Sequence, residues 1–177
     1  MSNDLKSTIA SISNSVRTNP QSAKVVFRAV SSSDTEGFTT SSKVRDFSLP
    51  LDEPLELGGQ DTGPNPVEAV LAALGGCQAI VYRAYAAALG LRLDNVSVET
   101  KGYLDLRGFL NLSDVGAGFE RVSYTTRIES PEPPEKLRQL ARLVEEHCPV
   151  LDTLRSPVEV TGTLEIISTP DAERSAA

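Results

Sequence analysis

A run of apolar residues from Pro66 to Leu89 constrains the fold of this chain more than any other feature of its sequence. Its only charged residues are Glu68 and Arg83, and apolar side chains lie all round the helical wheel. This pattern predicts an α-helix that is buried on every side and spans about 35 Å at 1.5 Å per residue. Pro66 suits the first helical turn, because the N–H that proline lacks would have no helical partner there. Cys77 lies at the centre of this helix, so its thiol serves either packing or chemistry.

The composition is typical of one globular domain that binds neither nucleic acid nor a membrane. Of 177 residues, 23% are charged and 40% are hydrophobic, and the formal net charge is −7. This charge argues against nucleic acid or an anionic membrane surface as a partner. The N-terminus lacks a basic segment followed by an apolar one, and Arg83 and Gly75-Gly76 interrupt the apolar run. We therefore expect neither a secretory signal nor a membrane span, and a cytoplasmic protein.

Cysteine and histidine usage argues against a metal site. The chain has two cysteines, Cys77 and Cys148, and one histidine, His147. A structural zinc site groups four such ligands, so we expect no metal and no cofactor. In a cytoplasmic chain the two thiols are expected to be free or redox-active rather than joined in a permanent disulfide.

The remaining patterns predict an α+β order of helices and strands. Amphipathic spacing predicts a short helix over residues 3–17 and a second long helix that begins near Pro131 and ends at Pro149. β-formers and alternating apolar residues predict strands over 24–30, 38–49, 91–106, 119–128 and 158–166. Because regular crossover helices do not separate these strands, we expect antiparallel sheet. We expect one domain over residues 1–177, with a helical extension at 1–20 and a flexible tail at 169–177.

The central helix also predicts a homodimer. A helix that is apolar on all sides needs cover on all sides. One sheet, one other long helix and one short helix barely provide that cover. We infer that a second copy of the chain buries the helix further.

The two cysteines are placed so that their thiols can meet. Cys77 is central in the apolar helix, and Cys148 ends the second long helix on the face that carries Leu137, Leu140 and Val144. A peroxidatic thiol attacks the O–O bond of a peroxide and becomes a sulfenic acid, which a resolving thiol converts into a disulfide. The alternative is that both thiols pack as small apolar groups, as buried free cysteines commonly do.

Two motifs resemble those of the OsmC/Ohr superfamily. The first is Gly58-Gly59-Gln60-Asp61-Thr62-Gly63-Pro64-Asn65-Pro66-Val67-Glu68 followed by Leu71-Ala72-Ala73-Leu74-Gly75-Gly76-Cys77, and the second is His147-Cys148-Pro149-Val150 followed by Leu154. Asp52-Glu53-Pro54 is similar to one OsmC-like branch. The resemblance covers roughly residues 24–167. It implies an OsmC-like α+β fold, in which antiparallel sheets surround two long central helices of an intertwined homodimer.

The resemblance also implies a function. It implies a thiol-dependent peroxidase that reduces organic hydroperoxides to alcohols in oxidative stress defence, with a dithiol reductant as its other partner. Cys77 matches the peroxidatic position and Cys148 the resolving one. One alternative is a non-catalytic dimeric module that binds an apolar small molecule between its subunits. A further alternative is a hydrolase that uses Cys77 as an acyl nucleophile, but the chain has no second histidine to act as its base.

The activation of Cys77 stays open at this point. The family's organic-hydroperoxide branch uses an arginine held by a glutamate directly after the proline of the Asn-Pro motif. This chain has Val67 there, and Glu68 follows one residue later. At about 100° per residue, Glu68 points away from Cys77 unless the first turn is irregular or the residue acts across a dimer. Its alternative role is that of an acid placed against the helix dipole.

Two arginines are candidates for the positive charge that would stabilise a thiolate at Cys77. Arg45 is preferred over Arg28, because its predicted strand runs into the loop that precedes the first motif. The alternative for each is an ordinary exposed strand residue. The predicted catalytic residues are therefore Cys77, Cys148, Glu68 and Arg45.

Overall fold

The computed structural model describes residues 2–33 and 36–167, so the predicted tail at 169–177 lies outside the described residues. Its elements in chain order are helix α1 (Ser2–Thr18), strands β1 (Val30–Ser33), β2 (Thr40–Val44) and β3 (Phe47–Leu51), helix α2 (Pro66–Leu89), strand β4 (Asn95–Leu104), helix α3 (Leu106–Phe109), strand β5 (Phe119–Glu129), and helices α4 (Pro134–His147) and α5 (Pro149–Arg155). Short 3₁₀ turns lie at Pro20–Ala23 and Leu55–Leu57.

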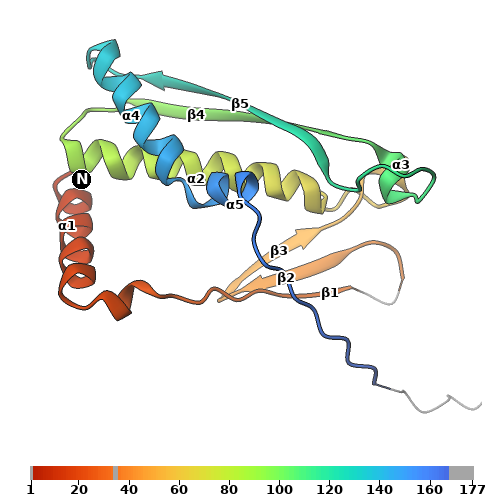
Figure 1. Ribbon diagram of the computed structural model, residues 1–177. Helices are drawn as coiled ribbons and strands as arrows, with labels where there is room; N and C mark the ends of the chain where they lie inside the picture. The colour runs from red at the N-terminus through yellow and green to blue at the C-terminus, as the bar shows by residue number, and fades with distance from the viewer. Residues whose placement is uncertain (1, 34–35, 168–177) are drawn as a thin grey trace, which may run out of the picture.

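The chain forms two antiparallel sheets on different sides of α2 (Figure 1). Strands β4 and β5 form a long ribbon that covers one face of α2, and α4 packs across that helix. Strands β1, β2 and β3 form a meander near the N-terminal end of α2. Helix α1 stands against the other end of α2, and an extended segment connects α1 to β1. The expected α+β architecture with antiparallel sheet is confirmed.

The boundaries of α2 follow from local chemistry. At its start the side chain of Asn65 accepts a hydrogen bond from the Glu68 amide, and the Glu68 carboxylate accepts one from the Asn65 amide. This reciprocal pair satisfies two N–H groups that lack helical partners. At its end Gly90 adopts the left-handed conformation with φ of 71°, which glycine reaches without steric cost. The predicted limits of this helix are confirmed.

The burial of α2 differs from the prediction. Within one chain the buried residues are Leu74, Gly75, Gln78, Tyr82 and Ala86, which lie on one face. On other faces Ile80 is 71% exposed and Leu89 is 53% exposed. Thus a single chain covers the helix on one side, and the expectation of burial on every side is wrong for the isolated chain. α2 is also long and apolar enough to cross a membrane, judged by length and composition alone. Core helices of soluble proteins meet the same two criteria.

Two apolar clusters hold α2 to its neighbours. The first joins α2, α4 and the start of β4 through Tyr82, Ala86, Leu93, Leu140 and Val144. The second, which we call the thiol cluster, has Leu74, Cys148 and Leu151 at its centre, and the side chains packed against it are Cys77, Val81, Val122, Tyr124 and Val150. α2 lies against the ribbon at Gly75, where an added Cβ would make van der Waals contact with the carbonyl oxygen of Val98 at 3.4 Å.

Three strand predictions differ from the structure. Residues 24–29 are extended without strand partners, and only Val30–Ser33 pairs, with β2. The expected single strand over 38–49 is a hairpin, since β2 and β3 pair across a turn at Arg45 and Asp46. The expected closing strand over 158–166 is extended and unpaired among the described residues. The apolar side chains of both unpaired segments are exposed: Phe27 is 90% and Ile166 is 82% accessible. These sequences have strand propensity, but a strand also needs a neighbour to bond.

The glycine-rich loop before α2 is held by one buried carboxylate. Asp52 accepts hydrogen bonds from the Thr62 hydroxyl at 2.8 Å and from the amides of Glu53, Gln60 and Thr62. Burial acts to raise the pKa of Asp52, but these hydrogen bonds outweigh it and lower the pKa below its usual value. Gly59 packs so closely that an added Cβ would lie inside the backbone of Glu53. This loop therefore fixes where α2 begins.

The cap of α2 gives a stability prediction. Replacing Asn65 with Ala removes the acceptor for the Glu68 amide, and we expect the free energy of unfolding to fall by about 1 kcal/mol. The matched control is Asn14→Ala in the exposed interior of α1, where alanine is the better helix former and no loss is expected. Chemical denaturation at one fixed protein concentration measures both. Equal stability of the two variants would contradict the capping role.

Candidate functional site

Cys148 occupies the break between two helices. It ends α4 and precedes α5 with φ of −79° and ψ of 112°, an extended conformation that interrupts the helical path. Pro149 causes the break, because proline disfavours helical geometry in the residue before it and suits the first turn of a new helix. The turn places the thiol in the thiol cluster, where it is fully buried. The predicted helix end is confirmed, while α5 itself was not predicted.

Cys77 lies in the same cluster from the opposite side. It is part of α2, packs against the group formed by Leu74, Cys148 and Leu151, and is partly exposed, unlike Cys148. Both cysteines are free thiols in this structure. The structure thus brings together the two residues whose meeting the sequence predicted, one accessible and one enclosed.

The electrostatics of Cys148 favour its neutral thiol. Burial raises the pKa of Cys148, the amides of Leu151 and Val150 oppose this, and the neighbouring Cys77 thiol adds to the increase. The effect of Cys77 is direct, since two thiolates side by side repel each other. A thiol of this kind does not attack first, because the thiolate is the nucleophile.

Three polar side chains lie beside the thiol cluster, and the sequence interpretation missed their role. Tyr124 of β5 packs against the cluster and donates its hydroxyl hydrogen to Oε1 of Glu145 on α4 at 2.9 Å. Gln78, the residue after Cys77, is only 1% exposed; neither polar atom of its amide makes a well-formed hydrogen bond, although the amide lies within reach of the Tyr124 hydroxyl. A polar residue inside an otherwise apolar helix was the available signal for Gln78. The signal for Glu145 was weaker: it lies three residues before Cys148, a spacing that makes two residues neighbours on a helix.

The structure places Glu68 at the helix cap. Its carboxylate accepts a hydrogen bond from the Asn65 amide at 2.9 Å and is exposed, about two and a half turns of helix away from Cys77. Val67, at the position where the organic-hydroperoxide branch has its glutamate, is 37% exposed. Within one chain Glu68 is thus engaged in capping, and its predicted catalytic role stays a prediction.

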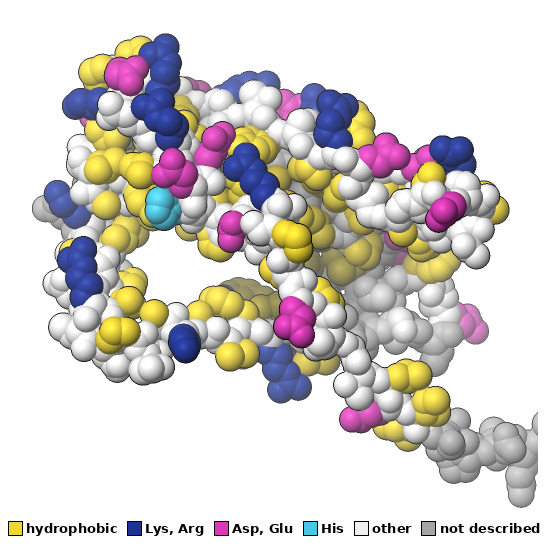
Figure 2. Space-filling view, in the orientation of Figure 1, with side chains coloured by type: hydrophobic (Ala, Val, Ile, Leu, Met, Phe, Trp, Pro, Cys, Tyr) yellow, Lys and Arg dark blue, Asp and Glu magenta, His cyan; other side chains and the backbone are white. Residues whose placement is uncertain are grey.

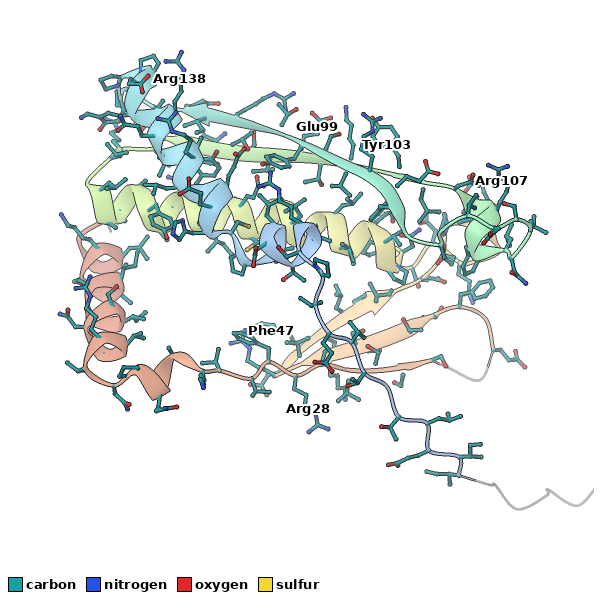
Figure 3. The ribbon with its side chains drawn as sticks, viewed as in Figure 1. Arg28, Phe47, Glu99, Tyr103, Arg107 and Arg138 are labelled. Atoms are coloured by element: carbon teal, nitrogen blue, oxygen red, sulfur yellow. The ribbon has the colours of Figure 1, made fainter. Side chains whose placement is uncertain are left out.

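The two candidate arginines lie on the meander side of the chain. Arg45 sits in the turn between β2 and β3 with a positive φ of 55°, and its guanidinium lies 5.1 Å from the centre of the Phe47 ring. A non-glycine residue in this conformation is strained. Arg28 lies in the extended segment, and Figure 3 shows its side chain directed away from α2. Neither arginine has a recorded contact with Cys77 within the described residues, and the predicted role of Arg45 stays a prediction.

Arg83 and His147 have structural contacts. Arg83 donates to the backbone carbonyls of Leu93 at 2.6 Å and Asp94 at 3.3 Å, which ties the end of α2 to the start of β4. His147 ends α4 with its Nδ1 bonded to the carbonyl of Leu143, at 2.9 Å, and its ring beside Tyr85. His147 is therefore not placed to act as the base for an acyl nucleophile at Cys77. Among residues 5–33 and 36–167, no three His, Cys, Asp or Glu side chains group to hold a metal ion.

An apolar cavity lies at the N-terminal end of α2, outside the thiol cluster. Its volume is about 390 Å³. Asp52 and Glu53 supply its acidic groups, and the apolar part of its lining comes from the meander, the loop and α3: Phe38, Leu51, Leu57, Pro66, Leu106, Phe109 and Leu110. A cavity of this size and lining can accept a small apolar molecule.

Sequence comparisons relate the chain to proteins of one family. The sequence model of the family described as OsmC-like protein matches residues 59–162. A hydroperoxide reductase of Mycoplasma genitalium is 31% identical over 109 residues, which cover 61% of this chain and 72% of that protein. An uncharacterised protein of Haloferax volcanii is 28% identical over 130 residues, which cover 73% of this chain and 88% of that protein.

Solved structures share the fold. An OsmC-like protein from Mycoplasma pneumoniae aligns with a TM-score of 0.64 at 18% identity, over 75% of this chain and 89% of that chain. An organic hydroperoxide resistance protein OsmC from Legionella pneumophila aligns with a TM-score of 0.56 at 22% identity, over 75% of this chain and 92% of that chain. The expected OsmC-like α+β fold is confirmed. Since the family match spans more than half of the sequence and includes both cysteine motifs, the chain belongs to the OsmC-like protein family.

Proposed function

We propose that this protein is a thiol-dependent peroxidase that reduces organic hydroperoxides to alcohols. One observation carries the proposal: Cys77 and Cys148 lie in one apolar cluster, with Cys77 partly exposed and Cys148 fully enclosed. An accessible thiol that meets a substrate, beside a protected thiol that waits for it, is the arrangement that two-step peroxide reduction needs. Family membership and the relative named hydroperoxide reductase support a peroxide-related role.

The proposed reaction has two steps. The thiolate of Cys77 attacks one oxygen of the O–O bond, that bond breaks, and the alkoxide leaves and takes a proton to become the alcohol. Cys77 is then a sulfenic acid. The sulfur of Cys148 attacks the sulfur of Cys77, the S–O bond breaks, and hydroxide leaves as water after taking the proton of Cys148. A dithiol reductant attacks the resulting disulfide and restores both thiols.

The surroundings of Cys77 favour an organic substrate. The cluster that it packs against is mainly apolar, with Leu74 and Leu151 at its centre and Val81, Val122 and Val150 around them. Apolar walls of this kind stabilise the hydrocarbon part of an alkyl hydroperoxide and offer little to the small polar molecule hydrogen peroxide. Action in the cytoplasm against oxidative stress is part of the proposal, since dithiol reductants are maintained there.

A homodimer completes the proposal. Figure 2 shows an opening through the isolated chain between α2 and the extended segment below it. Ile80 of α2 and Val26 and Phe27 of the extended segment are exposed apolar side chains that a second chain could cover. A second copy that placed its own α2 there would cover the free face of α2, and it would give the segments 24–29 and 158–167 strands to pair with. Gly76, on the exposed side of α2 with nothing near its Cα, would permit close helix contact.

Dimerisation also bears on the activation of Cys77. Arg28 and Arg45 line one surface hollow together with the exposed Val26 and Phe27 of the extended segment. In such an assembly an arginine of one chain would approach Cys77 of the other, and its positive charge would stabilise the thiolate. The strained backbone of Arg45 favours this residue, because strain in a native structure is often retained for function.

A second candidate function is supported by the apolar cavity and the capped Glu68. In this alternative the protein is a non-catalytic dimeric module that binds an apolar small molecule. Its support is that Glu68 is engaged in the helix cap while Val67 occupies the neighbouring position. The two functions differ in one measurable property, the reactivity of Cys77 with peroxide.

Replacement of each cysteine tests the peroxidase. We expect Cys77→Ser to abolish the reduction of cumene hydroperoxide with a dithiol reductant, because the nucleophile is lost. We expect Cys148→Ser to perform one turnover and accumulate a sulfenic acid, which dimedone labels and mass spectrometry detects. The control is Glu56→Gln, an exposed residue of the 3₁₀ turn at Leu55–Leu57 outside the thiol cluster, which is expected to retain turnover within about twofold. Equal turnover by Cys77→Ser and the unaltered protein would refute the mechanism.

Charge placed on the extended C-terminal segment tests the dimer. Val160 and Leu164 lie on the apolar face of its alternating pattern, so the double variant Val160→Lys, Leu164→Lys should weaken strand pairing and yield monomer. The matched control, Thr161→Lys with Thr163→Lys, places the same charges on the other face and should leave a dimer. Light scattering after size exclusion measures the mass. A monomeric unaltered protein at all concentrations would contradict the proposed assembly.

A further inference from the structure

We propose that the hydrogen bond from Tyr124 to Glu145 holds Cys148 in position beside Cys77, and so sets the rate at which their disulfide closes. The inference rests on the proposed thiol chemistry of the two cysteines. Tyr124 and Glu145 are positioning residues in this proposal, because they act through the placement of Cys148 and need not touch either sulfur. Both lie outside the two cysteine motifs.

The two helices on either side of Cys148 are attached to the rest of the chain mainly by apolar packing. Cys148 lies at the break between α4 and α5. Leu140 and Val144 of α4 and Leu151 of α5 are buried in the two apolar clusters. Apolar burial is not directional, so it limits the rotation of a helix less sharply than a hydrogen bond does.

One directional bond joins these helices to the rest of the chain. The hydroxyl of Tyr124 on β5 donates to Oε1 of Glu145 on α4 at 2.9 Å. Among the side chains that the structure describes, no other hydrogen bond or ion pair joins α4 or α5 to a strand or to α2. The remaining polar contacts of α4 and α5 lie within each helix or reach the residues directly beside it. The bond to Tyr124 is therefore the contact that fixes the rotation of α4 against the ribbon.

This bond lies close to both cysteines. Glu145 precedes Cys148 by three residues, about one turn of helix, so a shift of Glu145 passes directly to the break. Tyr124 packs against the thiol cluster. The amide of Gln78, the residue after Cys77, lies within reach of the same hydroxyl. One hydroxyl group thus lies between a neighbour of Cys77 on α2 and a neighbour of Cys148 on α4.

The local electrostatics keep the Tyr124 hydroxyl a donor. Burial raises the pKa of Tyr124, and the hydrogen bond and charge of Glu145 raise it further. The charge of Arg155 opposes this increase without outweighing it. Tyr124 therefore keeps its hydrogen at neutral pH. A carboxylate acceptor also forms a shorter and stronger hydrogen bond than a neutral oxygen does.

Disulfide closure is sensitive to positioning of this kind. A disulfide requires Cα atoms about 4.4–6.8 Å apart and a narrow range of dihedral angles. A displacement of about 1 Å in a reacting group can lower a rate by about a hundredfold. Without the bond to Tyr124, Cys148 would occupy a wider range of positions, and fewer of them would have the geometry for attack. Cys77 belongs to another helix, so its own reactivity should not change.

The test follows closure without peroxide. Dithiobis-nitrobenzoate reacts with Cys77 and releases one thionitrobenzoate. The sulfur of Cys148 then bonds to the sulfur of Cys77, the bond from Cys77 to the second thionitrobenzoate breaks, and the proton of Cys148 passes to the solution. We expect Tyr124→Phe and Glu145→Ala to give the first release at the unaltered rate and the second about tenfold more slowly. Glu145→Gln keeps an oxygen acceptor and should retain most of the rate.

Two matched variants serve as controls. Tyr85→Phe removes a hydroxyl from α2, where the Tyr85 ring lies beside His147 of α4 and its hydroxyl makes no hydrogen bond within the described part of the chain. Glu146→Ala removes an exposed carboxylate about 100° further round α4 than Glu145. Both should close the disulfide at the unaltered rate.

Two further measurements separate positioning from a general loosening of the core. The double variant Tyr124→Phe, Glu145→Ala should close no more slowly than either single variant, because both substitutions remove the same bond. Equilibration with glutathione should show an effective concentration of the thiol pair about tenfold lower in Tyr124→Phe. For a two-electron couple, this is a shift of about 30 mV in reduction potential.

Two outcomes would overturn the inference. One is closure by Tyr124→Phe that is as fast as closure by Tyr85→Phe. The other is a double variant whose loss is the sum of the two single losses. Repeating the experiment with cumene hydroperoxide separates this inference from the proposed function. If the unaltered protein ignores the peroxide while closure after dithiobis-nitrobenzoate behaves as expected, the proposed peroxidase fails and the positioning role stands.

Discussion

The meeting of the two thiols depends on one interruption of helical structure, at the peptide that joins Cys148 to Pro149. Proline removes the N–H that would continue α4 and pushes Cys148 into an extended conformation. The chain turns there, and α5 leaves in a new direction with Leu151 directed into the cluster under α2. Without the break, Cys148 would continue along α4. Leu74 and Cys77 of α2 supply the other side of this cluster.

The sequence predicted those elements whose causes are local. The limits of α2 follow from Asn65, Pro66 and Gly90, and the end of α4 follows from Pro149, so no distant residue was needed. The segments 24–30 and 158–166 failed as strands for a different reason. Their side-chain pattern is that of a strand, but the partner they need is absent from a single chain. In the proposed dimer a second chain would supply that partner and would also cover the free face of α2, which is apolar all round.

The predictions for the candidate site also divide into those that follow from local sequence and those that depend on tertiary contacts. That Cys77 and Cys148 would share a core followed from helical periodicity, which the sequence displays. Glu68 shows the limit of a motif: its carboxylate serves the cap, a role that the spacing of Asn65 and Glu68 also permits. The contacts of Tyr124 and Gln78 could not be predicted, because they depend on the register of β5 against α2 and on which helix covers it.

The two cysteines have different chemical requirements, because Cys77 is partly exposed and Cys148 is fully buried. Cys77 needs positive charge to hold a thiolate, and in the proposed dimer Arg28 or Arg45 of the partner chain, which line one surface hollow, would supply it. Cys148 needs a proton acceptor instead, since it is neutral and enclosed. In the proposed dimer the charge for the first thiol would come from the partner chain, whereas the enclosure of the second thiol is complete within one chain. A monomeric variant should therefore lose the fast attack of Cys77 and keep the closure of the disulfide once Cys77 has been modified.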